Sequence, residues 1–80
     1  MTVLDYKRIG QRIRETRMKR HMSVEELSSL VEISPSYLHR IESGAVNSIS
    51  LPAFVRIVNA LETTADALIY GGNSERRRFS

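Results

Sequence analysis

The sequence predicts an all-α fold, a compact domain of five short helices in which the second and third form a helix-turn-helix. Apolar residues recur at helical spacing in five successive segments, and no segment alternates long enough to indicate a strand. Four of these segments follow a hydroxyl residue of the kind that caps helix starts: Ser23, Ser34, Ser50 and Thr64. These caps indicate where the helices begin.

The first helix is expected over residues 5–20. Its apolar and charged residues separate onto two faces, as in an amphipathic surface helix. Gly10 weakens the prediction, because glycine inside a helix is destabilising. The expected inward residues are Ile9, Ile13 and Thr16, and the expected outward residues are Arg8, Arg14 and Lys19.

The second helix is expected to begin at Val24, because Ser23 and Glu26 form a capping box. Its apolar residues and those of the third helix recur so that two short helices share one buried face. Ser28 is small where the helices cross closely, and Ile33 is apolar inside the turn. The shared face comprises Leu27, Ser28, Val31, Ile33, Leu38 and Ile41.

The third helix is expected from Pro35 to Ser43. Ser34 is its N-cap, and proline at the first helical position lacks only a backbone N–H that would have no partner in the helix. Gly44 ends the helix, since glycine tolerates the left-handed conformation that closes one. Leu38 and Ile41 anchor the helix by one side, which leaves the other side free to meet a ligand.

A loop, AVNSI at residues 45–49, leads to a fourth helix over residues 51–62 that follows Ser50. Pro52 is tolerable in its first turn. Thr64 caps a short fifth helix, ADALIY, which Gly71 and Gly72 end. The fourth helix is expected to supply the backbone of the core through Leu51, Phe54, Ile57, Val58 and Leu61, and the fifth contributes Leu68 and Ile69.

Composition limits the kind of protein. The 80 residues suffice for one small domain, placed at residues 1–71, with a flexible arginine-rich tail at 72–80. The absence of cysteine excludes a disulfide framework and a thiolate zinc site. No signal-peptide pattern or run of 18 apolar residues occurs, so a soluble, cytoplasmic protein is expected. His21 and His39 stand eighteen residues apart without a paired-carboxylate motif, so no metal, cofactor or enzyme active site is expected.

The net charge of +3 is unevenly distributed. Residues 1–21 hold seven Lys and Arg against two acids, residues 22–75 hold two against seven, and residues 76–80 hold three Arg. A phosphate-binding surface would therefore draw on the first helix, the tail, Arg40 and backbone amides. Arg12, Arg20 and the run Arg76–Arg78 are expected to add unspecific attraction, unless that run only solubilises the tail.

Four segments, in this order and at this spacing, resemble the lambda-repressor-like helix-turn-helix family, also called XRE: IGQRIRETR at residues 9–17, SVEELS at 23–28, ISPSYLHRIESG at 33–44 and SLPAFVRIVNAL at 50–61. The resemblance covers roughly residues 8–70. It implies five helices, of which the second and third read DNA. It also implies that Arg17 pairs with Glu42 to brace the third helix and, as a second role, faces a phosphate.

The chain departs from the family pattern at four positions. Val24 stands where members commonly have a glutamine that helps to clamp phosphate, so the polar side chain for that contact is missing. His21, Glu32 and Glu62 occupy turns where glycine is usual, and each would cost about 1 kcal/mol in the left-handed region. These turns are either slightly strained or differently shaped.

On a helical wheel of the third helix, Ser36, Arg40 and Ser43 lie opposite the buried residues. Arg40 can present its guanidinium to the O6 and N7 atoms of guanine in the major groove. His39 either contacts DNA or is an exposed neutral imidazole, and Tyr37 either touches DNA or packs on the neighbouring helix. Phosphates are expected at helix starts and in the loop after Gly44. The expected DNA-binding residues are Arg17, Ser23, Val24, Ser34, Pro35, Ser36, Tyr37, His39, Arg40, Ser43 and Asn47, with Ser48 and Ser50 as further phosphate candidates.

These features predict a sequence-specific DNA-binding transcriptional regulator, a repressor that reads the major groove with the helix from Pro35 to Ser43 as a homodimer. Two operator half-sites about 34 Å apart would supply the specificity that one short helix lacks. The expected dimer interface uses Val55, Ile69 and Tyr70. Neither a membrane nor a small-molecule ligand is indicated. The alternative is a helical protein-interaction module, such as an antitoxin or a dimerisation component, which the acidic middle of the chain supports modestly.

Overall fold

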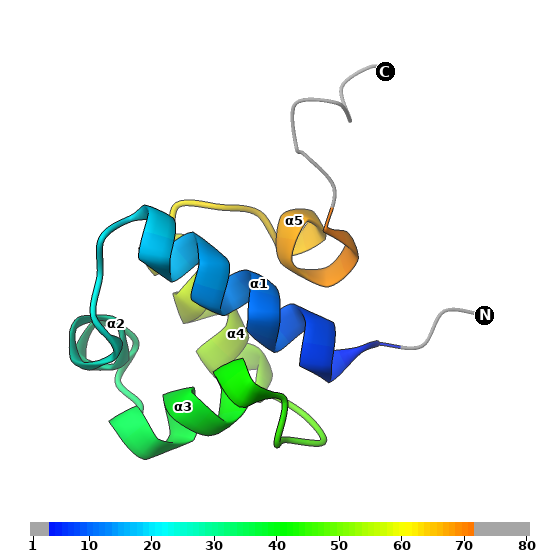
Figure 1. Cartoon of the computed structure of the whole chain (residues 1–80), viewed down its shortest axis with the longest axis horizontal. Helices are drawn as coiled ribbons and strands as arrows, with labels where there is room; N and C mark the ends of the chain where they lie inside the picture. Colours follow the sequence, from blue (N-terminus) through cyan, green and yellow to red (C-terminus); the bar gives the residue numbers. More distant parts are fainter. Residues whose placement is uncertain (1–3, 72–80) are drawn as a thin grey trace.

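The computed structural model describes residues 4–71 and shows five α-helices with no strand among those residues (Figure 1). The predicted all-α fold is therefore confirmed. The expected arginine-rich tail at 72–80 lies outside the described residues. The helices are α1 (Tyr6–Lys19), α2 (Val24–Val31), α3 (Pro35–Ser43), α4 (Leu51–Ala60) and α5 (Ala65–Tyr70).

Helix α1 is the centre of the arrangement, because it packs against α3 on one side and against α5 on another. Helix α2 lies at one end and contacts both α3 and α4. In Figure 1, α3 runs along the edge of the molecule opposite α5, so one of its sides faces away from the other helices. The helix-turn-helix formed by α2 and α3 thus stands at the surface.

Every helix begins after a side chain that accepts a hydrogen bond from the backbone N–H three residues later. These bonds satisfy donors that have no partner within the helix. At Ser23 the predicted capping box is complete, since Glu26 also accepts from the Ser23 backbone at 2.8 Å. The helix starts predicted from hydroxyl residues are confirmed. The N-caps are Asp5, Ser23, Ser34, Ser50 and Thr64.

Two predicted helices are shorter than expected. Helix α1 spans 6–19 and not 5–20, because Asp5 has extended backbone angles and serves as the N-cap. Helix α4 ends at Ala60 and not at residue 62, because Leu61 is its C-cap and Glu62 turns into the left-handed region. In both cases the difference lies in the residues that cap the helix.

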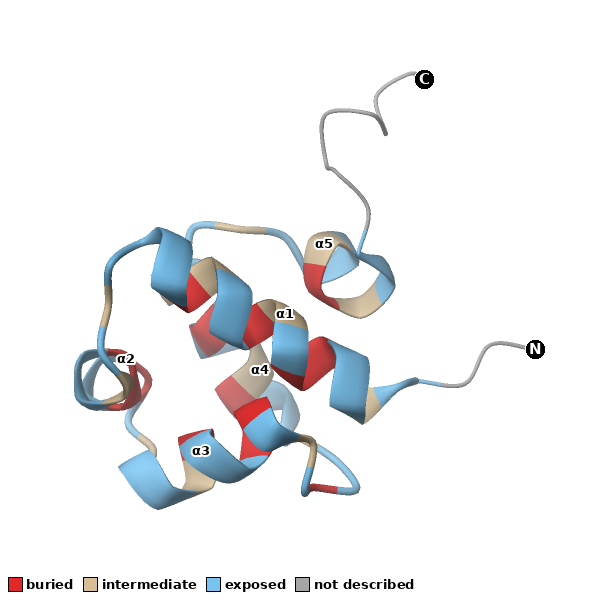
Figure 2. Ribbon diagram, viewed as in Figure 1, coloured by how far each residue is buried: buried red, intermediate tan, exposed pale blue. Residues whose placement is uncertain are grey.

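The core lies between the inward faces of the helices, as the buried residues in Figure 2 show. The expectation for Leu51 was wrong, since this side chain is 71% exposed. Ala53 is buried instead, and two residues correspond to a rotation of about 200° around a helix, which turns Leu51 outward. Thr16, Ile33, Phe54, Val58 and Ile69, also expected inside, are only partly buried. Fully buried are Ile9, Ile13, Leu27, Ser28, Val31, Leu38, Ile41, Ile57, Leu61 and Leu68.

Three turns hold non-glycine residues in the left-handed region, with φ of 58° at His21, 61° at Glu32 and 55° at Glu62. The strained alternative for these turns is therefore the correct one. Each residue costs about 1 kcal/mol relative to glycine. Gly44 and Gly71 adopt the same region, with φ of 81° and 76°, without that cost.

Gly10 allows the backbones of α1 and α3 to touch. A Cβ atom at this position would overlap the backbone carbonyl of Ile41 and lie 3.2 Å from the carbonyl oxygen of Glu42. The residue that weakened the prediction of α1 is thus required by the packing of α1 on α3. Any side chain larger than hydrogen would push α3 away from α1.

Replacing Gly10 by alanine is expected to lower the melting temperature, although helix propensity alone would raise stability by about 0.5–1 kcal/mol. The added methyl must displace the α3 backbone, and overpacking of this kind costs about 1–3 kcal/mol. Thermal unfolding followed by circular dichroism measures the change, with Gln11→Ala as the exposed control on the same helix. A higher melting temperature for Gly10→Ala would contradict the close contact.

Candidate nucleic-acid interface

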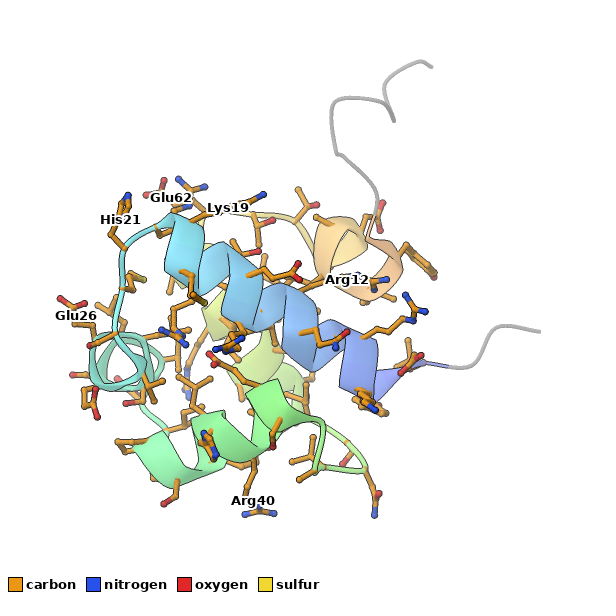
Figure 3. The ribbon with its side chains drawn as sticks, in the orientation of Figure 1. Arg12, Lys19, His21, Glu26, Arg40 and Glu62 are labelled. Carbon is orange, nitrogen blue, oxygen red and sulfur yellow. The ribbon has the colours of Figure 1, made fainter. Side chains whose placement is uncertain are left out.

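The outer side of α3 is open to solvent along its length. Leu38 and Ile41 are fully buried and hold the helix by its inner side. Most of the side chains that α3 was expected to present to DNA are exposed, and in Figure 3 Arg40 points away from the rest of the molecule. The exposed group consists of Ser36, His39, Arg40 and Ser43, together with Ser34 and Pro35 at the start of the helix.

Tyr37 supports Arg40 from the flank of α3. The tyrosine is partly buried and packs against the core, which was one of the two interpretations of this residue. The guanidinium carbon of Arg40 lies 5.9 Å from the centre of the tyrosine ring. A cation–π contact at an exposed site is worth about 0.5–1 kcal/mol. It limits the positions of the Arg40 guanidinium without occupying its N–H donors.

Arg17 and Glu42 form a buried ion pair between α1 and α3, as the family resemblance implied. Arg17 Nε donates to Glu42 Oε2 at 2.7 Å, and Nη2 donates to Oε1 at 3.0 Å. Nη1 donates to the carbonyl of Met22 at 2.8 Å, which adds the turn before α2 to the network. Arg17 is only 9% exposed, so its geometry corresponds to bracing α3 and not to facing a phosphate.

This network keeps Arg17 charged. Hydrogen bonding to Glu42 raises the pKa of Arg17 above its ordinary value, against the opposite effect of burial, and the charges of Glu42 and Glu25 add to the rise. A raised basic pKa contributes stability that is fully present below the ordinary arginine pKa and is lost only as the pH rises through the folded value. Arg17 therefore keeps its positive charge in the pair up to pH values above the ordinary arginine pKa.

Arg12 and Arg20, expected to add unspecific attraction to DNA, both have partners within the molecule. Arg12 Nη1 donates to the carbonyls of Leu68 at 3.1 Å and Ile69 at 2.7 Å, in the last turn of α5. Arg20 donates to the carbonyl of Glu62 at 3.1 Å and pairs with its carboxylate at 3.6 Å. In Figure 3, Arg12 lies beside α5 and Glu62 at the edge opposite Arg40.

Among the described residues, four Lys and Arg side chains have neither an acidic partner nor a carbonyl acceptor: Lys7, Arg14, Lys19 and Arg40. Lys7 and Arg14 line a cleft between α1 and α3 together with Gln11, His39, Glu42 and Ser43. The sequence-based prediction did not include Lys7 or Gln11 in the site. Their spacing with Arg14, at i, i+4 and i+7, is the signal that could have placed the three on one face of α1.

The remaining predicted phosphate contacts lie at the ends of the helix-turn-helix. Ser23 is exposed, but its hydroxyl already accepts from Glu26 N, and Val24 packs against the core. Asn47 and Ser48 are exposed in the loop after α3, which the buried side chain of Val46 anchors. The loop therefore presents polar groups beside the end of α3.

Within residues 4–71, no group of three His, Asp or Glu side chains is placed to hold a metal ion. None of the helices described is both long and apolar enough to cross a membrane.

The chain is similar to known helix-turn-helix proteins. A family model described as a helix-turn-helix domain matches residues 8–69. The restriction-modification controller protein C.AhdI from Aeromonas hydrophila is 33% identical, with a TM-score of 0.74, over 80% of this chain and 96% of that one. SinR, a master regulator for biofilm formation solved in complex with DNA, is 28% identical, with a TM-score of 0.71, over 75% and 95% of the two chains. No curated protein is similar enough to be counted as a relative.

The same fold also occurs inside an enzyme. Hydroxypropylphosphonic acid epoxidase from S. wedmorenis is 24% identical, with a TM-score of 0.75, over 85% of this chain and 36% of that one. At this level of identity the likeness shows the fold alone. It does not extend to the chemistry of the larger protein.

Replacing Arg17 by methionine is expected to lower the free energy of unfolding by about 3–5 kcal/mol, because it leaves the Glu42 carboxylate buried without its counter-charge. Arg14→Met is the control, an exposed arginine of the same helix whose loss should change stability by no more than about 0.5 kcal/mol. Urea unfolding measures both.

The double variant Arg17→Met/Glu42→Met is expected to recover most of the loss, since apolar side chains of similar volume can replace a buried pair. If Arg17→Met fails to fold, the double variant can still be compared with the parent protein and with Arg14→Met. Equal stability of Arg17→Met and Arg14→Met would contradict a desolvated pair.

Proposed function

The chain belongs to the helix-turn-helix domain family of DNA-binding regulators, and from this premise we propose that it is a sequence-specific repressor that binds an operator as a homodimer. The observation that carries the proposal is the exposed outer side of α3, with Arg40 free to meet a ligand while Leu38 and Ile41 hold the inner side. Because the family consists of regulators, we propose that this domain binds DNA and does not catalyse a reaction.

In this proposal α3 enters the major groove, which admits one α-helix. Arg40 offers two parallel N–H donors to O6 and N7 of guanine, a pairing worth about 1–3 kcal/mol of discrimination against another base. Ser36, His39 and Ser43 lie on the same exposed side and would contact neighbouring base edges or phosphates. The hydroxyls donate or accept, so Arg40 carries most of the base preference.

Contacts to phosphate would fix the register of α3 on the duplex without specifying its sequence. Asn47 and Ser48 are exposed in the loop after α3, and Ser50 precedes the start of α4, where backbone N–H groups favour an anion. Ser34 and Pro35 stand at the start of α3 itself. These groups would reach the backbone on the sides of the groove.

The proposed homodimer uses the apolar face formed by the start of α1 with α4 and α5. Val55 and Tyr70 are 47% and 59% exposed, and Ile69 lines a groove of about 390 Å³ on this face. Exposed Leu4 and Leu51 extend the same surface. Pairing through this face would bury side chains that a single small domain leaves in water. Two copies would then place two α3 helices on half-sites about 34 Å apart.

We propose that the protein lowers transcription, because a protein can repress a gene simply by occupying its operator. A dimer that covers two half-sites excludes another protein from the same DNA and needs no additional contact with that protein. Activation would require a further surface that binds the transcription machinery.

Fluorescence anisotropy with duplex DNA at varied salt tests the proposed function. Binding through about six to eight phosphates per dimer should give a slope of about −5 to −7 in a plot of log affinity against log salt concentration. The expected slope assumes that a dimer binds the duplex. Sedimentation of the free protein measures whether it is a dimer. Absence of binding even at low salt would contradict the function and favour the protein-interaction module.

Arg40→Ala is expected to lose discrimination at one base pair of the selected operator while random-sequence duplex binds about as before. Discrimination is lost because alanine cannot make the bidentate contact to guanine, and the energy of this contact is what distinguishes guanine from the other bases. The affinities of the parent protein and of Arg40→Ala are measured on a set of operators in which each position is replaced in turn by each of the other bases. Equal losses on operator and random duplex would instead assign Arg40 to the phosphate backbone.

A further inference from the structure

A polar cleft lies beside the contact between α1 and α3. Its volume is about 390 Å³, and Lys7, Gln11 and Arg14 line it from α1. His39 and Ser43, which belong to the exposed side of α3, line it from the other helix. The cleft and the surface proposed to read bases are therefore continuous.

The charge of this cleft is positive. Glu42 is the one acidic residue that lines it, and both of its carboxylate oxygens accept hydrogen bonds from Arg17. Lys7 and Arg14 have no acidic partner among the described residues. Two positive charges thus remain uncompensated in the cleft, and the side chain of Gln11 adds an amide donor.

The packing of α1 on α3 holds these groups in place. Because Gly10 brings the two backbones into contact, the side chains on either side of Gly10 flank α3 and do not separate the helices. The stem of Lys7 lies against Gly44, where an added Cβ would be 2.9 Å from Lys7 Cγ. The base of this side chain is therefore positioned beside the end of α3.

We propose that the cleft binds a phosphate group of the DNA backbone beside the major groove entered by α3, an inference that rests on the proposed function. The physical reason is size: the groove is about 12 Å wide, and an α-helix with its side chains fills about 10–12 Å of it. Cations at the side of the reading helix consequently face the sugar-phosphate backbone. Lys7 and Arg14 supply the charge, and Gln11 and His39 supply hydrogen-bond donors.

The test compares Lys7→Gln/Arg14→Gln with Arg8→Gln/Lys19→Gln. Both variants remove two positive charges from exposed positions of α1, but only the first pair lines the cleft. Anisotropy with random and selected duplexes gives the salt slope of each. The cleft variant is expected to bind both duplexes more weakly, with a slope shallower by about 2 per bound protomer, and the control to keep a slope within about 1 of the parent.

Equal slopes for the two variants would overturn the cleft assignment and leave DNA binding by the parent protein intact. Failure of the parent protein to bind any duplex at low salt would overturn the proposed function, and the cleft assignment with it. Circular dichroism melting of each variant confirms that the charge changes leave the fold in place.

Phosphate could also come from a free nucleotide, and a second arm separates the sources. An adenine mononucleotide is titrated into the ¹⁵N-labelled protein. Weak, unsaturated shifts at millimolar concentration support the DNA backbone as the occupant. Saturable micromolar binding that competes with duplex and is lost in Lys7→Gln/Arg14→Gln would overturn it in favour of a small phosphate ligand.

Discussion

The close packing of α3 on α1 is the constraint on which the rest of this structure depends. Gly10 lets the α1 backbone meet the carbonyl of Ile41, so α3 lies against α1 without a layer of side chains at that point. Leu38 and Ile41 can then reach the core, and the opposite side of a nine-residue helix remains exposed. The orientation of Arg40 and the position of the cleft beside α3 both follow from this one contact.

The fold separates the basic residues into two groups with different roles. Arg12 holds the last turn of α5 and Arg20 holds the turn after α4, so their charges are directed to the side of the molecule away from α3. Lys7, Arg14 and Arg40 remain without acidic partners beside or on α3, whereas Lys19, also unpaired, lies at the edge opposite Arg40 in Figure 3. A positive net charge therefore overstates the basic surface available to DNA, and the location of the unpaired cations is more informative than their number.

The local signals in the sequence predicted the helices well, because caps and apolar periodicity act over a few residues. Ser23 with Glu26, and Ser34 with Pro35, placed both helices of the helix-turn-helix. What depended on tertiary packing was not predicted: the outward Leu51, the carbonyl acceptors of Arg12, and the cleft between α1 and α3. Each of these is decided by which helix lies beside which, and a single helical wheel does not contain that information.

The ionic brace between α1 and α3 is better explained by orientation than by stability. Desolvating Arg17 and Glu42 offsets much of their attraction, and apolar side chains often replace such a pair without loss. Apolar packing alone, however, lets a short helix rotate or slide, whereas two parallel hydrogen bonds of 2.7 and 3.0 Å fix one register. In the proposed complex with DNA, a helix that offers a single arginine to base edges would tolerate little displacement, since bidentate contacts depend on distance and angle. The brace is therefore placed where a rotation of α3 would misalign Arg40.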